Sequence, residues 1–153
     1  MSNKPDATPN SINAAAAPHP DDETNGFGVL LPFAKFLGVH VIEQSPQRSQ
    51  LRIDPRPELL NSWGAMTGGV VMAMLDFAMA AAVRGQVGHN VSVATLDISL
   101  AFLNACRGEF VVEGRVLQAT KTAYFCEAEA KGPDGTLFAK SIGTFKPLAP
   151  KTS

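Results

Sequence analysis

Asp76 is the residue of this chain whose type and surroundings best suit catalysis. It is the only charged residue between Glu58 and Arg84, and its neighbours along the chain are apolar. Burying an unpaired carboxylate is costly or raises its pKa. In a partly dry cleft, such a carboxylate can attack an electrophilic carbon as a nucleophile or activate water as a general base. The alternative is a structural aspartate that hydrogen-bonds a loop or pairs with Arg84.

A glycine pair, Gly68 and Gly69, stands where a helix containing Asp76 would begin. The first N–H groups of a helix lack intrahelical partners and face the positive end of the helix dipole. Glycine lets a ligand approach them, so one N–H could polarise a carbonyl and hold the developing oxyanion. The alternative is that the pair only permits tight helix entry or packing.

The spacing of these residues has a geometric consequence. Gly68 and Asp76 are eight residues apart, which is about 12 Å along a helix. They cannot both touch one carbonyl from the same subunit. If both act, Gly68 of one chain must meet Asp76 of another across a two-fold axis. The chemistry therefore predicts a homodimer with two sites at its interface.

The element that carries Asp76 is predicted to be a helix over residues 67–84. The stretch has no proline, and Thr67 is a candidate N-cap. Large apolar side chains lie around most of its circumference, which predicts burial on nearly all sides. A curved sheet wrapped around the helix would bury it in a domain of this size.

Strands are predicted on both sides of this helix. Before it, a short helix within residues 27–37 ends at Gly38, and strands follow at 39–43 and 48–54, the second with Ser49, Leu51 and Ile53 on one face. An irregular loop spans 55–63. After the helix, strands are predicted at 92–103, 109–118, 124–131 and 136–146. Residues 92–103 alternate with Ala94, Leu96, Ile98, Leu100 and Phe102 on one face. Short connections favour antiparallel pairing, so the fold class is α+β.

Composition limits the domain organisation and the partners. The 153 residues carry a formal net charge of −1, which disfavours nucleic acid or an anionic membrane as partner. We expect a polar, flexible tail over 1–25, one domain over 26–148 and a C-terminal tail over 149–153. The most apolar stretch, 70–83, is shorter than the ~20 residues of a membrane span. Cys106 and Cys126 lack metal-ligand spacing and indicate reduced thiols in the cytoplasm.

The segment from Asn61 to Gly69 also resembles a known family. Asn61, Gly64, Thr67-Gly68-Gly69 and Asp76 have the spacing of the phenylacetate-degradation branch (PaaI-like) of the hotdog thioesterase superfamily. The similarity spans roughly residues 32–147. It implies a hotdog fold, in which an antiparallel sheet wraps around a long central helix. It further implies acyl-CoA hydrolysis without a metal or a bound cofactor, coenzyme A being part of the substrate, and dimers that often pair into tetramers.

The resemblance also assigns roles. It implies that Asp76 is the nucleophile or general base, that the Gly68 N–H is the oxyanion donor, and that Asn61 and Thr95 position water or the thioester. A turn-forming Asn61 and a Thr95 chosen for strand propensity are the alternatives. Gly69, Thr67, Trp63 and Met66 are expected to contact substrate, although core packing accounts equally well for Trp63 and Met66.

One position departs from the family pattern, because Thr67 stands where similar enzymes usually carry histidine. Threonine cannot titrate or present a ring nitrogen. The histidine could be a replaceable orienting residue, or the activity of this chain could be weak or altered. The leading alternative function is therefore a non-catalytic protein that binds acyl-CoA on the same fold. A hotdog hydratase and a purely structural protein are further alternatives. Arg84, Arg107 and Lys121 are candidate contacts for coenzyme A phosphates, or solvated surface charges.

Overall fold

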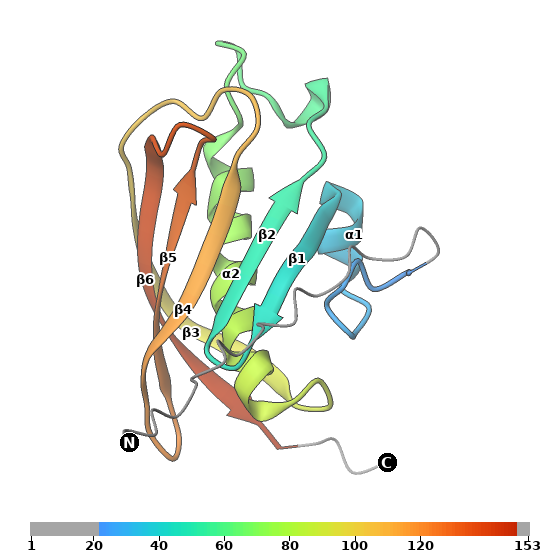
Figure 1. Cartoon of the computed structure of the whole chain (residues 1–153), viewed down its shortest axis with the longest axis vertical. Coiled ribbons are helices and arrows are strands. Elements are labelled where there is room, and N and C mark those ends of the chain that lie inside the picture. The colour runs from blue at the N-terminus through green and yellow to red at the C-terminus, as the bar shows by residue number, and fades with distance from the viewer. Residues whose placement is uncertain (1–21, 150–153) are drawn as a thin grey trace, which may run out of the picture.

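Six antiparallel strands curve around one long helix, α2 (Gly68–Val87), in the computed structural model, which describes residues 22–149 (Figure 1). The strands are β1 (Val39–Ser45), β2 (Arg48–Ile53), β3 (Ser92–Phe102), β4 (Val111–Ala119), β5 (Tyr124–Lys131) and β6 (Leu137–Leu148). Short helices α1 (Pro32–Leu37) and η1 (Pro57–Leu59) lie on the N-terminal side. The predicted α+β architecture is confirmed.

The order of the strands differs from their order in the chain. The sheet runs β1-β2-β4-β5-β6-β3, and every neighbouring pair is antiparallel. β3 is the first strand after α2, yet it pairs with β6 at one edge. The connection over residues 103–110 therefore leads from this edge strand to β4 in the middle of the sheet. Local sequence patterns predict strands but not this order.

The concave face of the sheet packs closely on α2. A Cβ atom added at Gly114 of β4 would lie 2.3 Å from the Ala78 carbonyl oxygen of α2. The buried Ser49 hydroxyl of β2 donates a hydrogen bond of 2.7 Å to the same oxygen. Eight α2 side chains are buried: Val71, Met74, Leu75, Ala78, Met79, Ala81, Ala82 and Val83.

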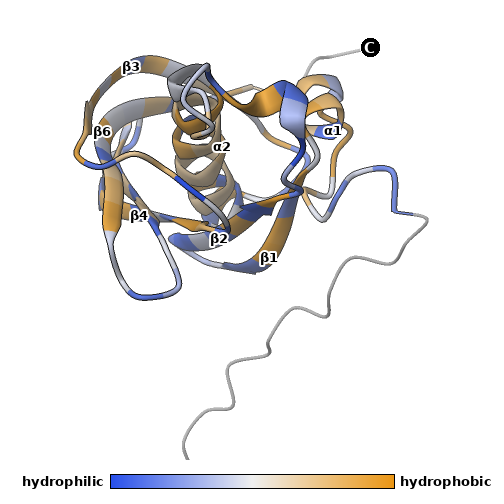
Figure 2. Cartoon of the chain, turned by 90° about the horizontal axis from the view of Figure 1, so that it is seen from above, coloured by the Kyte–Doolittle hydropathy of each residue, from blue (hydrophilic) through white to orange (hydrophobic). Residues whose placement is uncertain are grey.

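One side of α2 stays open, which corrects the prediction of burial on nearly all sides. Gly69 is exposed, Met72 is 44% exposed, and Ala73 and Asp76 are only partly buried. These positions have the i, i+3, i+4, i+7 spacing of one helix face. Figure 2 shows the sheet curving around α2, with β3 on one side of the helix and α1 on the other. A single copy of the chain does not cover this face.

The segment before β1 is fastened to the domain. The backbone N–H of Val41 donates to the Asn25 carbonyl, and the Asn25 amide donates to the Val39 carbonyl at 3.0 Å. Residues 22–25, which we expected within the N-terminal tail, thus form a turn against the edge of β1. Gly38 ends α1 with a φ of 78°, as predicted for a helix stop. The rest of the predicted tails, 1–21 and 150–153, lies outside the described residues.

α2 is longer than the predicted helix and is apolar enough, over 20 residues, to meet a length and composition test for a membrane span. Core helices of soluble proteins have the same length and apolar composition, and half of the apolar stretch of α2 is buried inside this domain. Packing against the sheet therefore accounts for its hydropathy.

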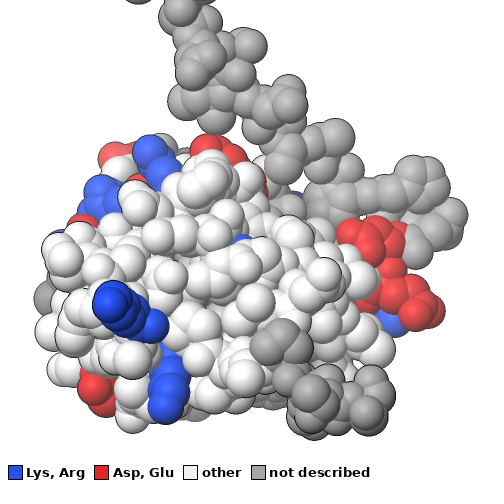
Figure 3. Space-filling view, turned by 90° about the horizontal axis from the view of Figure 1, so that it is seen from below, with Lys and Arg blue, Asp and Glu red and all other residues white. Residues whose placement is uncertain are grey.

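At the end of the molecule seen in Figure 3, charged side chains gather towards the rim and uncharged ones occupy the centre.

Candidate active site

Asp76 lies on the open side of α2 and contacts the edge strand β3. The Thr95 hydroxyl donates a hydrogen bond of 2.7 Å to the Asp76 carboxylate. Burial raises the pKa of Asp76, and the bond from Thr95 lowers it by less, so the net shift is upward. Within residues 22–149 no cation pairs with this carboxylate, so the alternative pairing with Arg84 is absent. Asp76 is therefore a poorly solvated carboxylate, and a carboxylate of this kind is a candidate for acid–base or nucleophilic chemistry.

A β-bulge brings Thr95 to Asp76. The pairing of β3 with β6 shifts between Thr95, opposite Phe145, and Asp97, opposite Thr144, which leaves Leu96 as the extra residue. Strict alternation would place Thr95 on the face opposite Ile98, whereas the bulge turns both towards α2. The sequence pattern wrongly placed Leu96 on the inner face. Leu96 is 57% exposed.

The N-terminus of α2 presents two free amides. Within residues 22–149, neither the Gly68 N–H nor the Gly69 N–H has a hydrogen-bond acceptor. A Cβ atom at Gly68 would lie 3.2 Å from the Phe102 ring, whereas a Cβ atom at Gly69 would have nothing within 4 Å. The two amides can therefore receive an anionic oxygen, with an aromatic wall beside Gly68 and open space beside Gly69.

Thr67 precedes these glycines but does not cap the helix through its side chain. It occupies the N-cap position, yet its hydroxyl makes no capping hydrogen bond. Its backbone carries the contacts instead, because its N–H donates to Leu59 and its carbonyl accepts from Val70 and Val71. The predicted cap is thus correct in position and wrong in chemistry. Among residues 22–149 the Thr67 hydroxyl has no hydrogen-bond partner, and it lies next to the Gly68 and Gly69 amides in the chain.

Asn61 shapes the loop ahead of α2. Its side-chain oxygen accepts hydrogen bonds from the backbone N–H groups of Trp63, at 2.9 Å, and Ala65, at 3.1 Å. This is the turn-forming role, the alternative to contact with substrate. The Asn61 side-chain N–H₂ group has no partner in the described part of the chain, so it can still contact a ligand.

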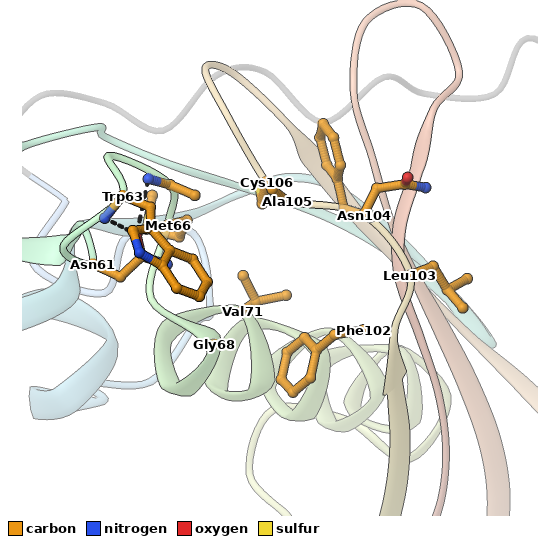
Figure 4. Close-up of a pocket in the computed structure, with 12 residues that line it drawn as sticks. Asn61, Trp63, Met66, Gly68, Val71, Phe102, Leu103, Asn104, Ala105 and Cys106 are labelled. Carbon is orange, nitrogen blue, oxygen red and sulfur yellow. Dashed lines mark hydrogen bonds between the residues drawn. The ribbon is translucent and has the colours of Figure 1, made fainter.

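A pocket of about 340 Å³ joins this loop to the helix N-terminus (Figure 4). Gly68 and Asn61 line it together with Asn104 and largely apolar walls, which include Trp63, Met66, Val71, Phe102, Leu103 and Phe138. No Lys, Arg, Asp or Glu of residues 22–149 lines it. The sequence-predicted residues Gly68, Asn61, Trp63 and Met66 thus lie around one cavity, and Met66 is buried, at 5% exposure. Such a cavity suits an uncharged group attached to a polarised carbonyl.

Three further residues line the pocket without being predicted from the sequence: Phe102, Leu103 and Phe138. They come from the end of β3 and the start of β6, which meet above the helix N-terminus only because β3 pairs with β6. No local pattern reports that pairing.

Asp76 does not line this pocket in one copy of the chain. It lies eight residues beyond Gly68 on a continuous helix, about 12 Å along the axis.

Cys106 lines this cavity, whereas Cys126 and Arg84 do not. Burial raises the pKa of Cys106 to about 11 and that of Cys126 to about 12, so both thiols are poor nucleophiles. Burial lowers the pKa of Arg84, whose Nε atom is buried without a hydrogen-bond partner. Across residues 22–149, no three His, Cys, Asp or Glu side chains are grouped closely enough to hold a metal ion.

Comparisons with known proteins agree with this architecture. A family model described as the thioesterase superfamily matches residues 64–139, which include α2 and the helix N-terminus. A protein of Saccharolobus solfataricus named "putative esterase" is 32% identical over 118 residues, covering 76% of this chain and 84% of its own length.

Two solved structures share the fold. A thioesterase family protein from Silicibacter pomeroyi is 25% identical with a TM-score of 0.72, covering 77% of this chain and 90% of its own. The PaaI protein of E. coli, from the phenylacetic acid degradation operon, is 18% identical with a TM-score of 0.69, covering 77% of this chain and 85% of its own. The hotdog fold expected from the resemblance is thereby confirmed, and the chain belongs to the thioesterase superfamily.

Proposed function

We propose that this protein hydrolyses the thioester of an acyl-CoA whose acyl group is aryl or of medium chain length. The observation that carries the proposal is the pairing of two features on one helix. The N-terminus of α2, at the positive end of the helix dipole, carries the Gly68 and Gly69 amides, which have no acceptor among the described residues, and it opens into an apolar pocket. The partly buried Asp76 carboxylate lies two helical turns further along α2. Thioester hydrolysis needs an oxyanion donor and a nucleophile or base, and these groups supply both.

In the proposed reaction the thioester carbonyl accepts a hydrogen bond from the Gly68 N–H. Asp76 either removes a proton from a water molecule that attacks the carbonyl carbon, or attacks that carbon itself and forms an acyl–aspartate anhydride that water then hydrolyses. In both routes the C–S bond breaks, coenzyme A leaves as the thiol with a proton that comes from the water, and the water oxygen ends in the released carboxylic acid or in the regenerated Asp76 carboxyl. The Thr95 hydroxyl orients the Asp76 carboxylate, and the free Asn61 N–H₂ group holds the thioester or the water.

The reaction is proposed to take place between two subunits. Asp76 and Gly68 of one α2 are about 12 Å apart along the axis, so Asp76 of the partner subunit must supply the carboxylate. The open face of α2 supports this arrangement, because Gly69, Met72 and Ala73 leave room for a second helix. β3 is an edge strand with Leu96 and Phe102 each 57% exposed, which a partner would cover. We propose a homodimer, which could pair further into a tetramer.

The remaining residues of the site are assigned to substrate binding. Gly69 gives space for close approach, and Trp63 and Met66 form apolar walls for the acyl group. The Thr67 hydroxyl stands where similar enzymes usually carry histidine. It can form hydrogen bonds but cannot act as an acid or a base, because threonine does not titrate at neutral pH. The proposal therefore gives the acid–base step to Asp76 alone.

The test is hydrolysis of a panel of aryl, short-chain and medium-chain acyl-CoAs, followed by release of free thiol. Wild type should turn over at least one of them, and Asp76→Asn should lose roughly 10²-fold or more in kcat. The asparagine oxygen can still accept the Thr95 hydrogen bond, so a folded but inactive variant assigns the loss to the carboxylate. If wild type binds acyl-CoA and hydrolyses none of the panel, the protein is a binder on the same fold, and Thr67→His becomes the variant to assay.

A further inference from the structure

The loop over residues 61–65 is closed on itself and presents one side chain. Asn61 accepts two backbone N–H groups through its side-chain oxygen, its own N–H donates to the Ala65 carbonyl at 2.8 Å, and its carbonyl accepts from Gly64 at 3.0 Å. Trp63 stands at the tip, where its side chain lines the pocket and is 78% exposed. In Figure 4 the indole hangs from this loop towards Val71 and Phe102. A rigid loop thus holds a large aromatic group at the open side of the pocket.

Arg107 ties this loop to the opposite wall. Its Nη1 atom donates a hydrogen bond of 2.6 Å to the Trp63 carbonyl oxygen, and Arg107 makes no other hydrogen bond or ion pair with a described residue. Arg107 belongs to the connection after β3, whose Leu103 and Cys106 also line the pocket. A second bond, from the Met66 N–H to the Cys106 carbonyl at 2.8 Å, joins the same two segments.

Gly64 is required beside this contact by its backbone conformation rather than by lack of space. Its φ is 72°, in the left-handed region, and a Cβ atom there would lie 3.6 Å from the Arg107 Nη1 atom. The backbone therefore turns sharply directly after Trp63 and exposes the Trp63 carbonyl to the guanidinium. A hydrogen bond from a cation to a carbonyl is stronger than one between neutral groups, so this contact favours one position of the loop tip.

From these contacts we propose that Arg107 is a positioning residue. It fixes the Trp63 backbone so that the indole forms the outer wall of the pocket and decides which acyl groups fit between this wall and Phe102. The inference rests on the proposed thioesterase function and deepens it by naming a specificity element. An indole that is already held in place loses less conformational entropy when the acyl group packs against it.

The same walls define the class of acyl group. Trp63, Phe102 and Phe138 offer apolar surface, and no cationic side chain lines the pocket. A second carboxylate on the acyl group would be buried here without a partner, which is costly. The site should therefore accept uncharged apolar acyl groups and reject acyl groups that end in a carboxylate.

The first experiment needs no activity, because Trp63 is the single tryptophan of the chain. Time-resolved fluorescence anisotropy of the full-length protein reports how freely its indole moves. Arg107→Met, which keeps much of the side-chain length and removes every donor, should increase the amplitude of fast local motion, and Arg107→Lys should restore most of the restriction, since one donor suffices for one bond. Arg52→Met, which removes an exposed arginine that contacts Asp54, is the matched control and should behave as wild type. Equal anisotropy decays for Arg107→Met and wild type would overturn the positioning role.

The second experiment separates positioning from contact with coenzyme A phosphates. Arg107→Met should raise KM about five- to tenfold for a bulky aryl-CoA, an effect of the size of one charged hydrogen bond, and less for acetyl-CoA. Inhibition by coenzyme A alone should be unchanged. An equal rise in KM for both thioesters together with weaker inhibition by coenzyme A would make Arg107 a phosphate contact and refute the proposal.

If the panel shows no hydrolysis, the proposed activity fails on its own. The anisotropy experiment then still decides the role of Arg107, and quenching of Trp63 fluorescence by aryl-CoA in Asp76→Asn decides the role of the indole. Quenching by aryl-CoA but not by coenzyme A supports the wall, whereas no quenching by either ligand overturns it.

Discussion

The Thr95 hydroxyl donates a 2.7 Å hydrogen bond to the Asp76 carboxylate, and this bond joins the edge strand β3 to the central helix α2. Two opposing influences act on the carboxylate. Burial raises the pKa of Asp76, and the hydrogen bond from Thr95, which is strongest to the charged form, partly offsets this. The bulge at Leu96 is what turns Thr95 towards the helix. The bulge in β3 thus affects the pKa of Asp76, the proposed catalytic residue, because it places the Thr95 hydroxyl against the carboxylate.

Thr95→Val tests this tuning, because valine keeps the shape and removes the donor. The pKa of Asp76 should rise further, so the acid limb of the kcat/KM–pH profile should move to higher pH. Activity at neutral pH should fall about tenfold, the scale of one lost hydrogen bond to a charged group. Thr95→Ser should keep the wild-type profile. Thr144→Val, at the neighbouring β6 position paired with Asp97, is the control for strand packing, and an equal effect there would remove the special role of Thr95.

Asp76→Asn should make the protein more stable at neutral pH. Because the folded pKa of Asp76 is raised above its ordinary value of 3.8, the folded state binds this proton more tightly than the unfolded state does. Wild type therefore loses stability as pH rises from about the ordinary value through the folded pKa, and asparagine avoids that loss. Thermal melts across pH should give the variant a higher Tm at pH 7 and no advantage below pH 3.8. A Tm gain that persists unchanged at low pH would contradict this explanation.

Much of the fold follows from short-range patterns. Residues 67–84 predict a helix because they lack proline and are apolar around the circumference, and α2 runs over Gly68–Val87. The alternation of Ser49, Leu51 and Ile53 predicts a half-buried strand, and all three are buried in β2. The resemblance, carried by Asn61, Gly68 and Asp76, led to the fold that the comparisons confirm.

The remainder depends on contacts between distant segments. Alternation in β3 could not reveal the bulge at Leu96, because a bulge depends on how β6 pairs with the strand. Phe102 and Phe138 reach the pocket through the same pairing. The open side of α2 is misjudged from sequence for a different reason. Apolar residues on all sides of a helix favour burial of every face. They do not tell whether a face packs against the same chain or against another molecule.

Asn61→Asp separates the two roles of Asn61. An aspartate can still accept the Trp63 and Ala65 N–H groups, so the loop should form and the Tm should change little. The side-chain N–H₂ group is lost, so kcat should fall about 10- to 100-fold if this group holds the thioester or the water. Steady-state kinetics with thermal melts on the same samples checks both statements. Full activity in the variant would leave Asn61 with the turn-forming role alone.

Gly114→Ala tests how closely the sheet packs on α2. The added methyl group would lie 2.3 Å from the Ala78 carbonyl oxygen, which is backbone and cannot move aside without shifting the helix. We expect a loss of about 2–4 kcal/mol in the free energy of unfolding, as for severe overpacking of a core. Denaturant unfolding measures it. Ala119→Gly, at the end of β4, the strand that contains Gly114, is the control. Gly135→Ala is unsuitable as a control because the φ of Gly135 is positive. A loss below about 1 kcal/mol would show that the helix and sheet are further apart than described.

Gly69→Ala gives the sharpest contrast between stability and function at the helix N-terminus. In one copy of the chain a Cβ atom at this position meets nothing within 4 Å, and alanine favours a helix by roughly 1 kcal/mol over glycine. The folded chain should therefore be as stable or more stable. If the thioester or the partner helix occupies the open space, the methyl group should raise KM or weaken the dimer. Sedimentation equilibrium measured beside acyl-CoA kinetics distinguishes these two effects. Gly68→Ala places its methyl group 3.2 Å from the Phe102 ring, so it should displace that wall and lower kcat/KM more strongly than Gly69→Ala does. A Gly69→Ala protein with unchanged kinetics and unchanged assembly would mean that neither substrate nor partner approaches this end of α2.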